Sequence, residues 1–362
     1  MKKTKKIIIL FCFAVFVFNL FSVNLMALDL IDSKNEMQDA TNSVNRLISV
    51  LDENRVVNTS YPLYGSNNDI VGYCFLLSPI GYVITSTNSA VVEASFEDCK
   101  SYQMLKELSN DMVYYAGPMS YYRKTNNEYV NVLTQNIMAV DSFEQSVNAY
   151  IAKTSVDAKE SLSTTSTVQP ASVILRYDIE GTLRSSISYN PTGICGATAA
   201  AILLMYYYDY KNQNIVPDEY VSTDAVSLIQ YLVPSIHGDI SNPTGAILED
   251  VRDGLDLYFL DMEISTVNLG SNIGYETVTN LTYLENSLNH TYLDMKAEIT
   301  SDRPIIVMLN GAPTYGNHFV VAHSVMQDAS GGTYYIYAND GWGSNNVLIN
   351  IEYAVGYVCL NK

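Results

Sequence analysis

One stretch of this chain decides the fold of its C-terminal half: 193-GICGATAAAILLMYYY-208. After Cys195 the residues are small and apolar on every side of a helix, which is typical of a helix buried in a core. The free N–H groups and the dipole at a helix N-terminus favour thiolate over thiol, so we expect a lowered pKa for Cys195. Three small residues around the sulfur leave room for another molecule to approach it: Gly193, Gly196 and Ala197.

Two later segments carry polar residues that a cysteine nucleophile needs. His318 follows Gly316-Asn317 and opens an apolar strand, and Asn339-Asp340 ends another β-like run before Trp342. Cysteine first, histidine later and then a polar orienting residue is the order of parts in cysteine nucleophile catalysis. A carboxylate or amide at 339–340 would orient the imidazole, and the indole would shield that contact from water. Taken singly, each has an ordinary interpretation: a core cysteine, a satisfied histidine and a strand-ending turn.

The remaining histidines are weaker candidates. Strand alternation points His323 to the face opposite His318, so we interpret it as structural. His237 and His290 lie in polar or helical sequence. The sequence has no HExxH, no paired CxxC, no histidine cluster, no GxSxG and no Walker loop, so we expect no metal and no cofactor.

The composition favours a globular protein of more than one domain. The chain has 362 residues, of which 48% are hydrophobic and 16% charged, enough to build sizeable cores. Its formal net charge of −18 repels phosphate backbones and anionic membranes. We therefore expect no nucleic-acid partner.

Residues 1–27 have the pattern of a secretory signal peptide. Four lysines precede the apolar run Ile7–Phe18, which is too short for a comfortable membrane span. We expect cleavage near Ala27 and a secreted or extracellular protein, although Leu25 fits the cleavage pattern poorly and an uncleaved anchor is the alternative. Four cysteines in the remaining chain do not make a disulfide framework. A Cys74–Cys99 pair stays an open alternative.

The order of elements predicts an α+β fold in two parts. Residues 154–172 are rich in Ser and Thr and poor in apolar residues, which predicts a linker between an N-terminal domain of 30–153 and a C-terminal domain of 173–362. Helical patterns are expected at 33–60, 141–152, 222–233, 245–258 and 281–300. Strands are expected at 71–77, 82–85, 112–115, 119–123, 129–133, 303–310, 318–325, 333–338 and 347–351. In the C-terminal half helices come first and antiparallel strands later, as in α+β domains.

Taken together, these motifs resemble a known family. The segment 193–208 is similar to the nucleophile helix of papain-like cysteine peptidases, above all the bacterial branches that include streptopain and the bacteriocin-leader-processing peptidases. The match continues in Gly-x-His with its apolar strand and in Asn-Asp-x-Trp-Gly, so that it covers roughly 173–362. More weakly, Gly72–Leu77 and Gly81–Ser86 resemble a streptopain-type pro-region.

The resemblance implies a role for each matching residue. Cys195 would be the nucleophile, His318 the base and then the acid, and Asp340 the orienting residue, with Asn339 as its close rival. Tyr189 stands where such enzymes usually carry a glutamine that donates to the oxyanion. Asn190, beside it, or the backbone N–H of Cys195 would be the replacement donor.

The resemblance also implies a function. It is that of an endopeptidase acting on proteins or peptides and made as a precursor, with its N-terminal domain as an intramolecular inhibitor. Two alternatives stay open: a catalytically weak surface binding protein with this fold, and an acyl transferase of transglutaminase type.

Overall fold

The computed structural model describes residues 35–51, 54–161, 175–191, 193–211, 213–238, 245–264, 271–275, 292–309, 318–327 and 333–360. The expected signal peptide, most of the expected linker and His290 lie outside these ranges. Within them, no helix combines the length and the apolar character that crossing a membrane requires.

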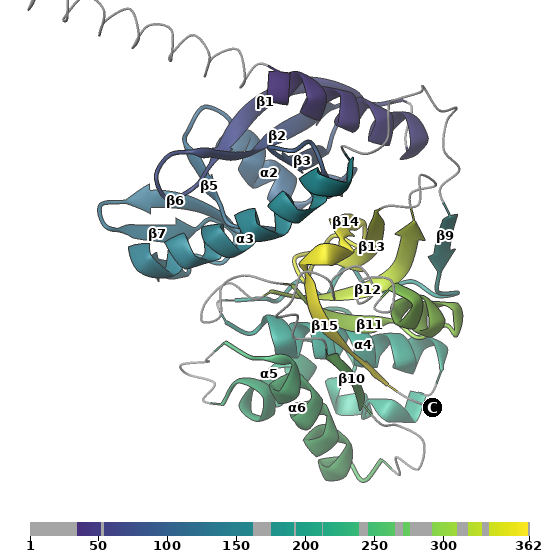
Figure 1. The fold of residues 1–362 in the computed structure, drawn as a ribbon. Coiled ribbons are helices and arrows are strands. Elements are labelled where there is room, and N and C mark those ends of the chain that lie inside the picture. The colour runs from purple at the N-terminus through teal and green to yellow at the C-terminus, as the bar shows by residue number, and fades with distance from the viewer. Residues whose placement is uncertain are drawn as a thin grey trace, which may run out of the picture.

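The N-terminal part begins with a helix over residues 35–51 that packs on the sheet (Figure 1). The elements that follow it are β1 (Val56–Tyr64), β2 (Ile70–Ser78), β3 (Tyr82–Ser86), β4 (Val91–Ser95), α2 (Lys100–Glu107), β5 (Val113–Tyr115), β6 (Tyr121–Thr125), β7 (Glu128–Asn131), β8 (Ile137–Ala139) and α3 (Val140–Ser161). The β2–β3 hairpin forms where the sequence predicts it, across the Ser78-Pro79 turn.

The C-terminal part, coloured teal through green to yellow in Figure 1, places its helices mostly before its strands. Its elements are β9 (Leu175–Asp178), α4 (Cys195–Tyr210), η1 (Gln213–Ile215), η2 (Asp218–Tyr220), α5 (Val226–His237), α6 (Leu248–Asp261), β10 (Ser271–Tyr275), a helix over 292–300, β11 (Ile305–Leu309), β12 (His318–Gln327), β13 (Tyr334–Asn339), β14 (Val347–Asn350), η3 (Ile351–Tyr353) and β15 (Ala354–Leu360). The fold is therefore α+β.

One sheet runs through both parts of the chain. Its strand order is β10-β15-β11-β12-β13-β14-β4-β3-β2-β1-β5-β6-β7-β8, with β9 paired to β12. The two parts meet where β14 pairs with β4 in antiparallel register, Val347 opposite Ser95 and Ile349 opposite Glu93. The expected N- and C-terminal domains are thus joined by backbone hydrogen bonds.

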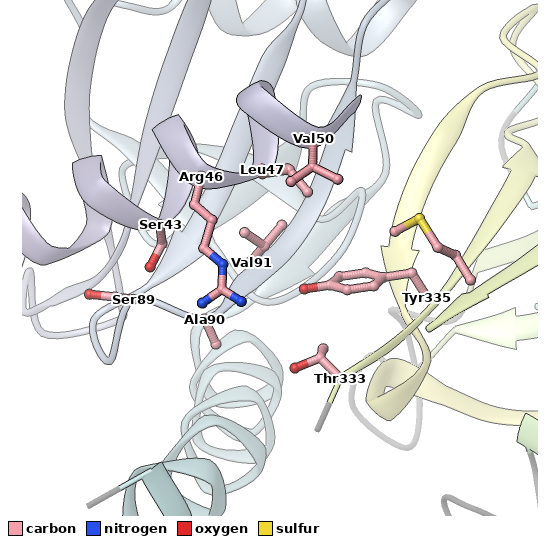
Figure 2. A pocket seen from close by; sticks show the side chains of 10 residues that line it. Ser43, Arg46, Leu47, Val50, Ser89, Ala90, Val91, Thr333 and Tyr335 are labelled. Atoms are coloured by element: carbon pink, nitrogen blue, oxygen red, sulfur yellow. The ribbon is translucent and has the colours of Figure 1, made fainter. Parts of the chain in front are cut away.

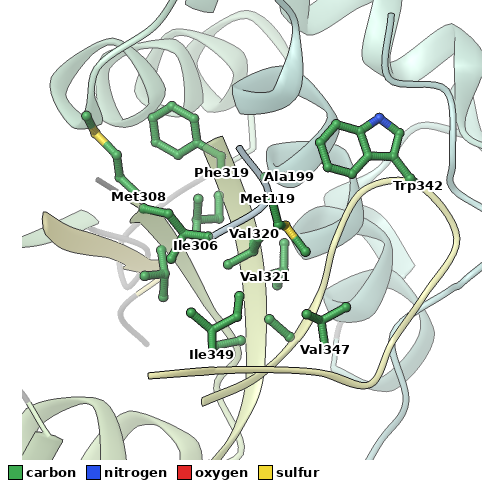
Figure 3. Close-up of a cluster of buried hydrophobic side chains, with 14 of the residues drawn as sticks. Met119, Ala199, Ile306, Met308, Phe319, Val320, Val321, Trp342, Val347 and Ile349 are labelled. Carbon is green, nitrogen blue, oxygen red and sulfur yellow. The ribbon is translucent and has the colours of Figure 1, made fainter. Parts of the chain in front are cut away.

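Helix α4 lies in the core of the C-terminal part. Every residue from Gly196 to Tyr207 is buried, as the uniformly apolar sequence predicts. The helix contacts β11 and β12 of the sheet, and α5 and α6 also pack against it. Figure 3 shows the side chains of β11, β12 and β14 gathered into one cluster with Ala199 and Trp342. Met119, from the N-terminal part, belongs to the same cluster.

Some elements differ from the sequence prediction. The first helix ends at residue 51, and β1 occupies the end of the range expected to be helical. Helix α3 is longer than the helix expected at 141–152 and runs to Ser161, into the first residues of the expected linker. Cys74 and Cys99 are both buried and both free, so the open possibility of a disulfide between them is wrong.

Candidate active site

The first residue of α4 is Cys195, as the sequence predicts. Gly193, with a φ of 85°, turns the chain into the helix in a conformation that favours glycine. The side chain is partly buried, and burial raises the pKa of the thiol. Backbone N–H groups near the sulfur lower the pKa of the thiol; they are those of Phe319, Gly196 and Cys195 itself. The expected lowering of the pKa is therefore wrong for this state of the protein, because burial outweighs the helix N-terminus.

His318 opens β12 beside the start of α4. It is 6% exposed, and its Nε2 lies 2.9 Å from the carbonyl oxygen of Asp340. Because a carbonyl only accepts, Nε2 carries the hydrogen and Nδ1 is the bare nitrogen of the neutral ring. The next residue along β12, Phe319, presents its N–H to the Cys195 thiol, so histidine and cysteine stand on adjoining elements.

The imidazole of His318 is held neutral. Burial lowers its pKa to about 4, the Asp340 carbonyl raises the pKa, and the Lys100 ammonium lowers it further. The ring stacks on Trp342 with centroids 4.2 Å apart and planes 7° from parallel. The indole thus covers one face of the imidazole, where the sequence predicts a shield.

The Asp340 side chain forms hydrogen bonds with the loop that follows it. Its Oδ1 accepts hydrogen bonds from the N–H of Trp342 at 2.8 Å and of Ser344 at 3.0 Å. Its Oδ2 is buried and has no hydrogen-bond partner among the described residues. Burial raises the pKa of this carboxyl to about 6, although the backbone N–H groups of Trp342, Ser344 and Asp340 itself lower the pKa. The contact with His318 is made by the backbone carbonyl, whereas the expectation was an orienting carboxylate.

Asn339 also shapes this loop. Its Oδ1 accepts from the N–H of Gly341 at 2.8 Å, and its Nδ2 donates to Asn345. Both side chains weighed as orienting groups thus stabilise the turn that aims the Asp340 carbonyl at His318.

Asn190 lies beside this turn and the first turn of α4. Its Nδ2 is buried without a hydrogen-bond partner among the described residues, 3.0 Å from the position a Cβ on Gly341 would take. That Cβ would also lie 3.5 Å from Thr198 in α4. A donor left unpaired at this place has the chemistry that the expected oxyanion role requires.

The N-terminal part contacts the same loop. Glu97 accepts hydrogen bonds from Ser344 Oγ at 2.9 Å and from Asn346 Nδ2. Lys100, the first residue of α2, places its Nζ 5.4 Å from the centre of the Trp342 ring and donates to the carbonyl of Leu133 at 2.8 Å. The residues that hold the loop and His318 are therefore in contact with the expected inhibitory domain.

Sequence reasoning undervalued one histidine near the site. His237 ends α5, is 1% exposed and accepts a hydrogen bond at Nε2 from the N–H of Ala197 in α4. A histidine in the last turn of a helix was the available signal, but such a residue usually serves its own helix. His323 is partly buried with Nε2 at the Asn345 carbonyl, a structural contact.

A separate cavity of about 170 Å³ lies between the 35–51 helix and β13 (Figure 2). Arg46 and Tyr335 line it, together with small polar and apolar side chains from Ser89 to Val91. No cysteine or histidine lines it, so it is distinct from the candidate active site. Among the described residues no group of histidine, cysteine and acidic side chains has the arrangement of a metal site.

No protein-family model matches the chain, and no curated protein matches it. Among solved structures, it is similar to a fragment of Prevotella intermedia prointerpain A at 12% sequence identity and a TM-score of 0.43. That similarity covers 83% of this chain and 97% of the other.

Proposed function

We propose that this protein is a cysteine endopeptidase made as a precursor and exported by residues 1–27. The observation that carries the proposal is the state of His318: its Nε2–H is held by the Asp340 carbonyl, its Nδ1 carries no hydrogen, and the strand it opens contacts the helix that begins with Cys195. An oriented imidazole with an unprotonated nitrogen, on an element that adjoins the thiol, can serve as the general base for that thiol.

In the proposed reaction, Nδ1 of His318 takes the thiol proton and the sulfur attacks the carbonyl carbon of a peptide bond. The C–N bond then breaks, and the imidazolium returns its proton to the leaving amine. Water attacks the resulting thioester with His318 again as base, which releases the carboxylic acid and the free thiol. The unpaired amide of Asn190 is the donor we assign to the oxyanion.

In our proposal, the N-terminal part inhibits this active site. Burial holds both the thiol and the imidazole in their neutral forms. Lys100 adds a positive charge beside the Trp342–His318 stack, which opposes protonation of the ring. Removing the N-terminal part would expose both groups to water and favour the thiolate–imidazolium pair. The partners are then a protein or peptide substrate and the chain's own N-terminal domain.

A specific experiment tests the proposal. The wild-type chain, Cys195→Ala and Cys359→Ala are purified and incubated with a reductant to allow cleavage, and a portion of each is then treated with E-64, an epoxide that traps papain-like thiols. We expect an adduct on Cys195 and cleavage within 162–174 for the wild type and for Cys359→Ala, since Cys359 is a buried thiol in β15. Cys195→Ala should show neither.

Three results would contradict the proposal. Equal cleavage of the Cys195→Ala chain would refute self-processing. A mature domain whose Cys195 resists the epoxide would favour the binding-protein alternative. If products carry an added primary amine at the new carboxyl end instead of ending in a free acid, the reaction is acyl transfer.

A further inference from the structure

The first turn of α4 has no capping side chain of its own. The N-cap residue, Ile194, offers no oxygen, and the structure shows no side-chain cap at this position. The first hydrogen bond within the helix runs from the N–H of Thr198 to the carbonyl of Ile194 at 3.0 Å. The N–H groups of Cys195, Gly196 and Ala197 therefore have no acceptor inside the helix.

His237 supplies an acceptor from a different helix. Its Nε2 accepts from the N–H of Ala197 at 3.1 Å, in the place where a Ser, Thr or Asp side chain normally caps a helix. An accepting nitrogen carries no hydrogen, so the neutral ring is protonated at Nδ1. With 1% of its surface exposed, the ring is fixed against the helix it caps.

Gly196 permits this approach. A Cβ at this position would lie 3.1 Å from Nε2 of His237 and 3.0 Å from Cγ2 of Val251. Both distances are shorter than ordinary van der Waals contact, so a Cβ here would push the ring and Val251 apart by a few tenths of an ångström, and glycine avoids that displacement. The glycine, the histidine and the helix start thus form one packed unit.

The other two N–H groups of the turn are left for the sulfur. Those of Cys195 and Gly196 both act on the Cys195 thiol and favour its ionised form. We propose that His237 is a positioning residue, which binds the Ala197 N–H so that the Cys195 and Gly196 N–H groups stay aimed at the sulfur. Its meaning for catalysis depends on the proposed peptidase function, whereas its effect on the thiol does not.

The test measures the thiol directly in the full-length chain. His237→Gln and His237→Met have side chains of the same length, but only glutamine offers an oxygen to the Ala197 N–H. The rate of Cys195 alkylation by iodoacetamide is followed from pH 5 to 10 by mass spectrometry of the Cys195 peptide. We expect His237→Met to react about tenfold more slowly at pH 7, with its rate profile moved to higher pH, because the thiolate fraction falls tenfold for each unit of thiol pKa. His237→Gln should stay within about twofold of wild type.

A matched control separates positioning from general destabilisation. Leu232→Ala removes a fully buried side chain from the same helix and leaves the Ala197 bond in place, so its alkylation profile should follow the wild type. A wild-type profile for His237→Met, or equal slowing of the glutamine and methionine variants, would overturn the proposal. If the chain showed the expected alkylation pattern but cleaved no peptide, the peptidase function would fall and the positioning role would stand.

Discussion

We predict that Glu93 makes the junction between the two parts of the chain sensitive to pH. It is fully buried in β4, opposite Ile349 of β14. Its Oε2 accepts from the N–H of Met119 at 2.7 Å, and its Oε1 accepts from the Tyr121 hydroxyl. Burial raises the pKa of this carboxyl to about 8, although the Met119 N–H and the Tyr82 hydroxyl lower it. At pH 7 the side chain is therefore mostly protonated and uncharged.

Glu93→Gln imitates that protonated form at every pH. In the wild type, the folded chain binds more protons than the unfolded chain between the ordinary pKa of 4.5 and the raised pKa of about 8. The free energy of unfolding then falls as the pH rises through this window. At about 1.4 kcal/mol for each pKa unit, the loss is on the order of 5 kcal/mol. The glutamine variant is spared this loss, so we expect the two chains to be similar near pH 5 and the variant to be several kcal/mol more stable at pH 9.

Urea unfolding of both chains at pH 5, 7 and 9 measures the effect, with Tyr fluorescence and circular dichroism as independent probes. Glu97→Gln is the control, because Glu97 also bridges the two parts but is only partly buried. Parallel pH profiles for the wild type and Glu93→Gln would refute the reasoning, since the raised pKa of a buried carboxyl requires them to diverge.

Three further predictions concern the His318 site. In the wild type, the free energy of unfolding should fall by about 3 kcal/mol as the pH rises from about 4 to 6, because the Asp340 carboxyl with its raised pKa binds more protons in the folded chain. Asp340→Asn should remove this fall, and thermal unfolding at pH 4 and 7 measures it. For His318 the sign is reversed: the wild-type free energy of unfolding should rise by about 3 kcal/mol between pH 4 and 6.5, since an imidazole with a lowered pKa binds fewer protons in the folded chain. His318→Gln should abolish this rise, and equal changes of both chains in the same scans would contradict the prediction. Lys100→Met should raise the pKa of His318, because it removes a positive charge that opposes protonation of the ring. An NMR titration of the imidazole with the same midpoint in both chains would disprove the coupling.

Local patterns predicted much of the fold. The buried α4, the β2–β3 hairpin and strands β11 to β14 follow apolar runs bounded by turn residues, which is the strongest signal in a single sequence. Strand β4 was missed because it is short and carries a charged residue, Glu93, whose burial depends on partners far along the chain. Its pairing with β14 joins segments some 250 residues apart, and nothing local specifies such a contact.

Of the candidate site, only the residues with chemically distinctive side chains could be predicted from the sequence. Cys195 and His318 have side chains whose chemistry is visible in the sequence, and the structure places them on adjoining elements. The group that holds the imidazole is the backbone carbonyl of Asp340, which every residue possesses and no sequence pattern marks. The burial that raises the pKa of the thiol likewise depends on the tertiary structure.

Because β4 pairs with β14, cleavage of the chain between its two parts does not by itself separate the N-terminal part from the C-terminal part. A break between Ser161 and Leu175 leaves the ladder from Val347 to Ile349 intact, along with the bond from Lys153 Nζ to the Glu352 carbonyl. A nicked molecule therefore keeps its N-terminal part bound without a covalent link. Departure of that part would leave β14 as an open sheet edge, with unpaired backbone groups and apolar side chains facing water. The rate at which the nicked form dissociates, rather than the rate of the cut, would then set when the site opens.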